Sequence, residues 1–248
     1  LGRELEATAQ VLAAERDAEA VRPRLLAPLD RWIAEGRYPD GGAARTRTLL
    51  TRMLDRERSA AHATATSALV GPGFHALADK MATLAWDVPL TPAAEQPCAE
   101  VLPDIAGAAY ETWRRRFEQL PPPLAAEEGD GDTRWLAAVG TTEAALHATE
   151  LCRPAAVVLD GQDSATLIAR LTLVSGALGE QRDAMLAAEC VHRAADTPRI
   201  AATTGYVLGR LHEEQRLAVL RARSAALGEG PAGAALPVGA AGTAGTAG

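Results

Sequence analysis

Lysine is almost absent from this sequence: Lys80 is the only lysine, and arginine supplies the rest of the 25 basic side chains. Acidic residues number 32, so the formal net charge at pH 7 is −7. Nucleic-acid binding draws on a strong positive field, and a chain with this overall balance does not carry one in bulk. We therefore expect no nucleic-acid specificity, and the bulk charge does not by itself indicate a binder of other polyanions either.

Cysteine and histidine are also scarce. Cys98, Cys152 and Cys190 lie far apart and form no CxxC pair, which argues against a disulfide framework and a zinc site. We expect these cysteines to be small, buried apolar residues. The five histidines form no HxxxH or HExxH pair, so we expect no metal site.

The chain lacks the common motifs of nucleotide-binding and catalytic sites. It contains neither a GxxxxGKS/T phosphate loop nor a GxSxG nucleophile elbow. Paired carboxylates occur only in segments that read as surface or linker, such as "HEE" at 212–214 and "AEEGD" at 126–130. We therefore expect the protein not to be an enzyme and to need no cofactor.

Aromatic residues and long apolar runs are missing as well. No run of about 18 apolar residues and no signal peptide is visible, so we expect no membrane span and a cytoplasmic location. Aromatics make up 4% of the chain, whereas hydrophobic residues make up 48% and are mostly Ala and Leu. Ala and Leu are strong helix formers, so this composition favours closely packed helices.

Prolines and glycines divide the chain into amphipathic segments. We expect helices over residues 3–21 with an end near Pro23, then to 35 with a bend at Pro28, and over 43–69, 74–86, 98–120, 133–151, 164–195 and 199–227. Asp163 is the expected N-cap of the long helix from 164. The pattern predicts an all-α protein with two antiparallel bundles. The first covers 1–120 and is incomplete at its start, 121–132 is a linker, the second covers 133–228, and 229–248 is a disordered tail.

Two short motifs recur in the same order. "LAAERDA" at 12–18 is echoed by "LGEQRDA" at 178–184, and "RMLDRERSAA" at 52–61 by "RLHEEQRLAV" at 210–219. Their common order predicts an internal duplication of a helical bundle. On a helical wheel, Arg16 and Arg182 of the first echo both lean toward the apolar face, where an unpaired charge is costly. Three explanations stay open: a structural salt bridge, a bound oxyanion inside the bundle, or snorkelling to solvent.

Other arginines lie opposite apolar faces or beside aromatic residues. Arg45, Arg52 and Arg56 share the outer face of the 43–69 helix, and Arg210 lies on the outer face of the last one. "WRRRF" at 113–117, with Arg114 and Arg115, is the densest basic cluster. Arginines beside aromatics can bind phosphates, but a charge run opposite an apolar stripe is equally typical of a solvated helix face.

The layout resembles the CHAD family, the conserved-histidine α-helical domain. The resemblance spans about residues 3–227 and rests on the two Arg-Asp echoes and on three longer segments: "LLTRMLDRERSAAHATATSALVGPGFHAL", "EVLPDIAGAAYETWRRRFEQL" and "YVLGRLHEEQRLAVLRARSAAL". It implies two helical bundles related by an internal pseudo-twofold duplication, which bind inorganic polyphosphate through basic residues and often accompany a CYTH-type triphosphatase domain. The implied polyanion-binding residues are Arg45, Arg52, Arg114, Arg115, Arg182 and Arg210.

The sequence departs from the family in two places. The family's first helix, with its histidine and arginine-rich run, has no counterpart in these residues. The helix at 133–151 carries Leu136, Gly140, Glu143 and Ala144 where basic or histidine residues would lie. We therefore expect weak binding of polyphosphate or another polyanion. The alternative function is a degenerate, non-catalytic scaffold that packs against a partner protein or an attached domain, which an exposed apolar groove would favour.

Overall fold

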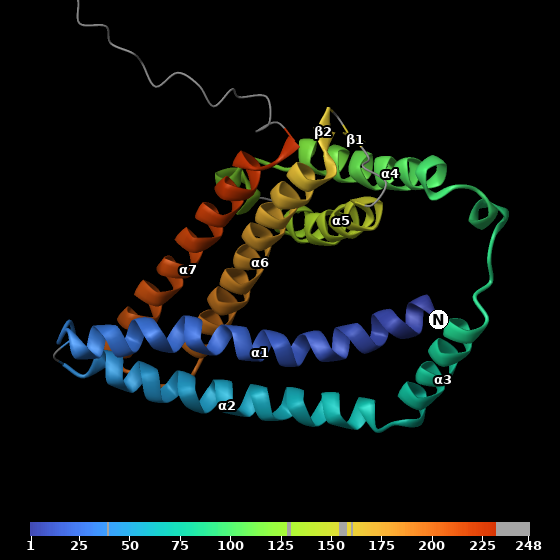
Figure 1. The fold of residues 1–248 in the computed structure, drawn as a ribbon. Coiled ribbons are helices and arrows are strands. Elements are labelled where there is room, and N and C mark those ends of the chain that lie inside the picture. The colour runs from blue at the N-terminus through green and yellow to red at the C-terminus, as the bar shows by residue number, and fades with distance from the viewer. Residues whose placement is uncertain (39, 128–129, 154–157, 160, 232–248) are drawn as a thin grey trace, which may run out of the picture. The chain divides into compact units, whose positions relative to one another are not determined.

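The computed structural model describes residues 1–38, 40–127, 130–153, 158–159 and 161–231. The helices are α1 (Gly2–Ala34), α2 (Gly42–Leu69), α3 (Pro72–Trp86), α4 (Cys98–Glu118), α5 (Gly131–Cys152), α6 (Ser164–Ala195) and α7 (Ala202–Gly228) (Figure 1). Two short 3-10 helices, η1 (Pro92–Glu95) and η2 (Pro123–Glu127), lie between them. Strands β1 (Val158–Leu159) and β2 (Gln162–Asp163) form a two-residue antiparallel ribbon. The prediction of an all-α protein is confirmed.

Helix α1 is one continuous helix through Pro23 and Pro28, so the expected helix end near Pro23 is wrong. Proline removes one backbone hydrogen bond and crowds the preceding turn, which locally disfavours a helix. Beyond Pro23, however, α1 buries Leu25, Leu29 and Trp32 in the core at exposures of 4% or less. Tertiary packing of this apolar face outweighs the local cost of the prolines.

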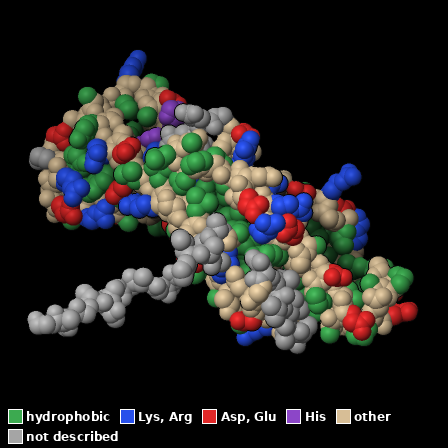
Figure 2. All heavy atoms as spheres, turned by 90° about the horizontal axis from the view of Figure 1, so that it is seen from above, with side chains coloured by type: hydrophobic (Ala, Val, Ile, Leu, Met, Phe, Trp, Pro, Cys, Tyr) green, Lys and Arg blue, Asp and Glu red, His purple; other side chains and the backbone are tan. Residues whose placement is uncertain are grey.

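Helices α1 and α2 run side by side in opposite directions, and charged side chains pair along their shared edge (Figure 1). Each step of four, three or eight residues forward on α1 is matched by an equal step backward on α2. The pairs are Glu15–His62, Glu19–Arg58, Arg22–Asp55 and Asp30–Arg47. An exposed pair adds little stability by itself, but a regular series disfavours any other register of the two helices. Acidic and basic side chains are also interleaved over the face drawn in Figure 2.

The described chain forms two compact units, and neither is a continuous piece of sequence. The first unit comprises Leu1–Gln96 and Glu180–Leu220, and the second comprises Pro97–Gly179 and Arg221–Gly248. Helices α6 and α7 each contribute residues to both units. The expected linker at 121–132 falls within the second unit, where it includes η2 and the first residues of α5. Residues 232–248 of the expected tail lie outside the described residues.

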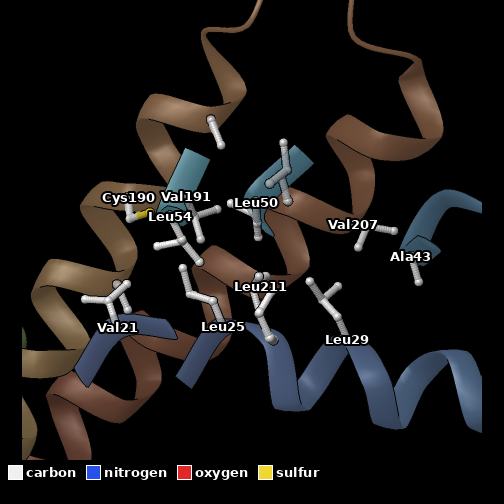
Figure 3. Packing of buried hydrophobic residues seen from close by; sticks show 14 of the residues in the cluster. Val21, Leu25, Leu29, Ala43, Leu50, Leu54, Cys190, Val191, Val207 and Leu211 are labelled. Carbon is white, nitrogen blue, oxygen red and sulfur yellow. The ribbon is translucent and has the colours of Figure 1, made fainter. Parts of the chain in front are cut away.

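The core of the first unit combines α1, α2, the second half of α6 and the first part of α7. Pairs of leucines four residues apart, Leu25 and Leu29 on α1 and Leu50 and Leu54 on α2, point toward Val191 of α6 and Leu211 of α7 (Figure 3). Leu25, Leu29, Leu50 and Leu211 are fully buried. This spacing places them on one face of each helix, so the four helices enclose a continuous apolar interior.

The second unit is built around aromatic residues. Trp113 of α4 and Trp135 of α5 are fully buried and pack with leucines of the first half of α6. Two arginines lie over these rings: the Arg170 guanidinium is 5.6 Å from the Trp113 centroid, and that of Arg223 is 5.4 Å from the Trp135 centroid. Arg223 is only 1% exposed and donates a 2.5 Å hydrogen bond to Asp132, so its buried charge is compensated.

Asp163 caps α6, and two of the three cysteines are buried. The Asp163 carboxylate accepts hydrogen bonds from the backbone N–H groups of Ala165 (2.9 Å) and Thr166 (3.0 Å), which confirms it as the cap of α6. These bonds, with that of the Thr166 hydroxyl, lower the pKa of Asp163. Cys152 and Cys190 are buried as expected, and burial raises the pKa of Cys190 to about 12. Cys98 is exposed, so the expectation was wrong there, because the start of α4 is largely exposed.

Replacing the fully buried Leu25 with Ala should lower the free energy of unfolding by about 2–5 kcal/mol, because the change leaves a cavity between α1 and the helices it packs against. Leu217→Ala on α7 is the matched control: this side chain is 46% exposed, so we expect a change below about 0.5 kcal/mol. Urea unfolding followed by circular dichroism measures both. Equal losses for the two variants would contradict the assignment of this core.

Candidate functional site

Most arginines of the described chain pair with carboxylates. Every long helix except α3 contributes at least one such arginine: Arg16, Arg22, Arg24, Arg31, Arg37, Arg47, Arg58, Arg114, Arg115, Arg134, Arg182, Arg193 and Arg223. A guanidinium bound to a carboxylate can bind an external anion only by giving up or sharing that partner. The arginines outside this set are therefore the first candidates for a binding site.

The two echoed Arg-Asp motifs meet in the first unit. Arg182 of α6 donates a 2.6 Å hydrogen bond to Asp17 of α1, and both side chains are about three-quarters buried. Arg16 lies 3.1 Å from the other oxygen of the same carboxylate. Of the three explanations for Arg182, the structural salt bridge is confirmed. Its partner is the aspartate of the other echoed motif, which the sequence pattern did not identify.

Asp183 completes this group, which we call the Arg-Asp cluster (Arg16, Asp17, Arg182 and Asp183). Burial raises the pKa of both aspartates, and Arg16 opposes the shift at each of them. The charge of Asp183 raises the pKa of Asp17 further. The cluster contains equal numbers of cations and anions, so it has no excess charge for a ligand. We infer a structural role for Arg182 in the absence of ligand.

Arg16 is not buried against an apolar face: its side chain is 64% exposed, and its carboxylate partner is the neighbouring Asp17. The apolar stripe on which the helical wheel placed it is itself exposed in this half of α1: Leu5 is 39% and Leu12 is 40% exposed. Burial of the stripe begins only at Val21. A helical wheel gives the direction of a side chain but not how much of the helix is covered.

Three residues spaced by seven form a polar row along α1 and bind α6 and α7. Asp17 binds Arg182, as described above. Arg24 donates hydrogen bonds to Gln215 (2.8 Å) and Glu180 (2.9 Å), and Arg31 approaches Glu214 at 3.4 Å. A spacing of seven residues keeps such side chains on one face of a helix. These contacts attach α1 to α6 and α7. They also occupy Arg24 and Arg31 of α1 with partners inside the protein.

In the WRRRF cluster, two of the three arginines are neutralised by their own helix. Arg114 binds Glu111 at 2.8 Å and Glu118 at 2.5 Å, and these carboxylates raise the pKa of Arg114. Arg115 lies 3.7 Å from Glu111. Arg116 has no carboxylate partner among the described residues. Although this segment contains three arginines, only Arg116 keeps a positive charge that no nearby carboxylate of the described chain offsets.

The outer face of α2 carries three arginines that lack carboxylate partners within the described chain. Arg45, Arg52 and Arg56, the α2 arginine row, are exposed and lie on one face, because steps of seven and four residues are close to whole helical turns. Arg45 donates 2.8 Å hydrogen bonds to the Asp40 carbonyl and to the Thr203 hydroxyl of α7, both neutral acceptors. The row differs sharply from the opposite edge of α2, where Arg47 and Arg58 pair with α1.

Close contact between α2 and α7 brings Arg45 to Thr203. Gly42 makes this approach possible: a Cβ atom there would lie 3.0 Å from the Thr203 carbonyl oxygen and 3.3 Å from Val207. Arg210, further along α7, is exposed and has no carboxylate partner among the residues described. Of the six arginines implied by the resemblance, Arg52 and Arg210 are thus open to ligand, Arg45 is bound only to neutral oxygens, and Arg114, Arg115 and Arg182 are paired.

The chain is an all-α protein in which two Arg-Asp motifs from different helices meet. Comparisons with known proteins place it in a family of helical domains. The family model described as "CHAD domain" matches residues 1–156. This chain therefore belongs to the CHAD family. It is similar to the solved structure of PptA from Streptomyces chartreusis, with 35% sequence identity and a TM-score of 0.75 over 92% of this chain and 77% of that one. No curated protein matches the chain.

In the part of the chain that the structure describes, no three His, Cys, Asp or Glu side chains are grouped so as to hold a metal ion. Among the same residues, no helix is both long enough and apolar enough to cross a membrane.

Removing the Arg182 side chain leaves Asp17 without its cross-helix partner, so Arg182→Ala should lower the free energy of unfolding by about 1–3 kcal/mol at pH 7. Because burial raises the pKa of Asp17, protonation of this group favours the folded state; that contribution is present at low pH and is lost as pH rises through the raised pKa. The cost of Arg182→Ala should therefore shrink between pH 7 and pH 4, which urea unfolding at both pH values measures.

Arg16→Ala is the control for this prediction, because it removes an arginine beside the same aspartate but from an exposed position. We expect it to change the free energy of unfolding by less than about 0.5 kcal/mol. The structural role of Arg182 would be contradicted by equal losses in the two variants, or by an Arg182→Ala variant as stable as the parent.

Proposed function

We propose that this chain is a binding module for inorganic polyphosphate or another extended polyanion, and that it holds the anion mainly through the α2 arginine row and Arg210. One observation carries the proposal. On α2, the arginines of one edge are consumed by pairing with α1, whereas Arg45, Arg52 and Arg56 have no carboxylate partner within the described residues. Membership of the CHAD family supports the choice of polyphosphate.

The geometry of the row suits a long anion. Eleven residues of α-helix separate Arg45 from Arg56, which corresponds to about 16 Å along the axis. A single small ion could contact only part of such a row, whereas a chain of linked phosphates could contact all of it. The planar guanidinium can donate two parallel hydrogen bonds to a phosphate, which favours arginine over lysine for this recognition.

The small number of arginines without carboxylate partners in the described chain supports weak binding. Affinity for a polyphosphate comes largely from the number of cations that displace its counterions, and the row with Arg210 offers few. The net charge of −7 adds long-range repulsion. Arg114 and Arg115 would contribute only where the polyanion displaces Glu111 and Glu118, and Arg182 only by disrupting the Arg-Asp cluster. We therefore expect an affinity between millimolar and micromolar, without catalysis.

A second function is favoured by the distribution of apolar side chains in the first unit. Leu5 and Leu12 of α1, and Met81 and Leu84 of α3, are 38–49% exposed, and Trp86 is 92% exposed. A scaffold that packs against a partner protein or an attached domain would cover such residues. A CYTH-type triphosphatase domain is the partner that the family resemblance suggests for this role.

Titration of long-chain polyphosphate at 20 mM salt, followed by calorimetry, tests the first proposal. We expect binding that weakens steeply as salt is raised, because each neutralised phosphate releases counterions. Arg52→Ala combined with Arg56→Ala should reduce the affinity at least about tenfold and flatten the slope of log K against log salt by about one per lost contact.

The control is Arg47→Ala combined with Arg58→Ala, which removes the same charge from the same helix but from the edge that faces α1. We expect this variant to keep most of the affinity and the salt slope of the parent. No binding at 20 mM salt would exclude polyphosphate and leave the scaffold. Equal losses in the two double variants would show that net charge, and not the α2 arginine row, determines binding.

A further inference from the structure

A pocket of about 270 Å³ lies in the second unit, and Arg116, Gln119 and Arg134 line it. Arg116 and Gln119 come from the last part of α4 and Arg134 from the first turn of α5. The two helices pack together, and Cys152 at the far end of α5 donates a hydrogen bond to the Leu102 carbonyl near the start of α4. They therefore run antiparallel, which brings the end of α4 to the start of α5.

Each lining residue can donate hydrogen bonds into the pocket. Arg116 has no carboxylate partner among the described residues, so its whole guanidinium is available. Arg134 binds Asp130 at 3.0 Å through Nε, which leaves its two terminal nitrogens for another acceptor. The amide of Gln119 adds a neutral donor. Arg134 also belongs to the first turn of a 22-residue helix, whose amino end carries partial positive charge.

From this convergence we propose that the pocket binds a compact phosphate-type oxyanion of two or three linked phosphoryl groups, such as pyrophosphate or tripolyphosphate. Two guanidinium forks and an amide match the many acceptor oxygens of such an ion. Asp130 offsets part of the positive charge of Arg134. The volume admits several oxygen-rich groups but not a folded peptide segment.

This site is separate from the α2 arginine row, because all its residues belong to the second unit. It does not rest on the proposed function: the pocket can bind a free oligophosphate whether or not a long polyanion binds α2. The end of a long polyphosphate chain presents the same chemistry as a free oligophosphate. The two sources differ in the length of chain beyond the pocket, and this difference can be tested.

The decisive experiment is calorimetric titration of the full chain with tripolyphosphate and pyrophosphate, and with succinate as a carboxylate probe. We expect tripolyphosphate to bind with an affinity that Arg116→Ala and Arg134→Ala each reduce about tenfold, since each removes charge-assisted hydrogen bonds. Arg116→Lys with Arg134→Lys should lose affinity several-fold, because lysine keeps the charge but lacks the planar fork. Succinate should bind at least about tenfold more weakly.

Arg114→Ala with Arg115→Ala is the matched control, because it removes two charges from the same helix outside the pocket. We expect it, and Arg47→Ala with Arg58→Ala, to leave tripolyphosphate binding within about twofold of the parent. Circular dichroism and thermal melting verify that every variant is folded. The proposal would be overturned by absence of tripolyphosphate binding, by equal loss in the control variants, or by succinate binding as tightly as tripolyphosphate.

A competition measurement separates the two sources of ligand. If the pocket takes chain ends, long-chain polyphosphate should displace labelled tripolyphosphate from the Arg52→Ala, Arg56→Ala variant in proportion to the concentration of ends. If it takes free oligophosphates only, long chains should not displace the label from this variant. Either result supports the site, and failure of the α2 variants to change long-chain binding would count against the proposed function alone.

Discussion

The carboxylates of this protein compete with any external anion for the same arginine guanidinium groups. This competition determines both how the helices pair and where an anion can bind. The chain has more acidic than basic residues, and almost all of its cations are arginines. Within the described residues, most of those arginines bind carboxylates, either on a neighbouring helix or one turn away on the same helix. What remains for a ligand is decided by the few positions that this pairing leaves open, and not by the total number of arginines.

The same competition gives α2 two different edges. Arg47 and Arg58 face acidic side chains of α1 and keep the hairpin in register. Arg52 and Arg56 lie about a third to a half turn away around the same helix and face solvent. A change that moved one acidic residue onto the outer face would convert a ligand contact into another intramolecular pair. Arginine therefore serves both for pairing between helices and for binding a ligand. Only the position of each arginine around the axis of α2 decides which of these two roles it has.

Local patterns predicted the elements but not their partners. The helices at 42–69 and 164–195 agree closely with the expectation, because apolar periodicity, flanking glycines and the Asp163 cap all act over a few residues. The break at Pro23 failed because burial of Leu25 and Leu29 in the core is not visible locally. The wheel placed Arg52 and Arg210 on outer faces correctly. The pairing of Arg182 with Asp17, 165 residues away, and the meeting of Arg116 with Arg134 depend on tertiary packing, and no local signal encodes them.

The contribution of α6 and α7 to both units has a consequence for how this chain can be divided. Each unit is assembled from two separate stretches of sequence, so no single cut divides the chain into two fragments that each contain one whole core. A break between α4 and α5 would leave α1 and α2 without the helices that cover Leu25 and Leu50, and would leave α5 and α6 without Trp113. Any single cut therefore disrupts at least one of the two cores, and the smallest piece of this architecture that keeps both cores intact is the interleaved pair.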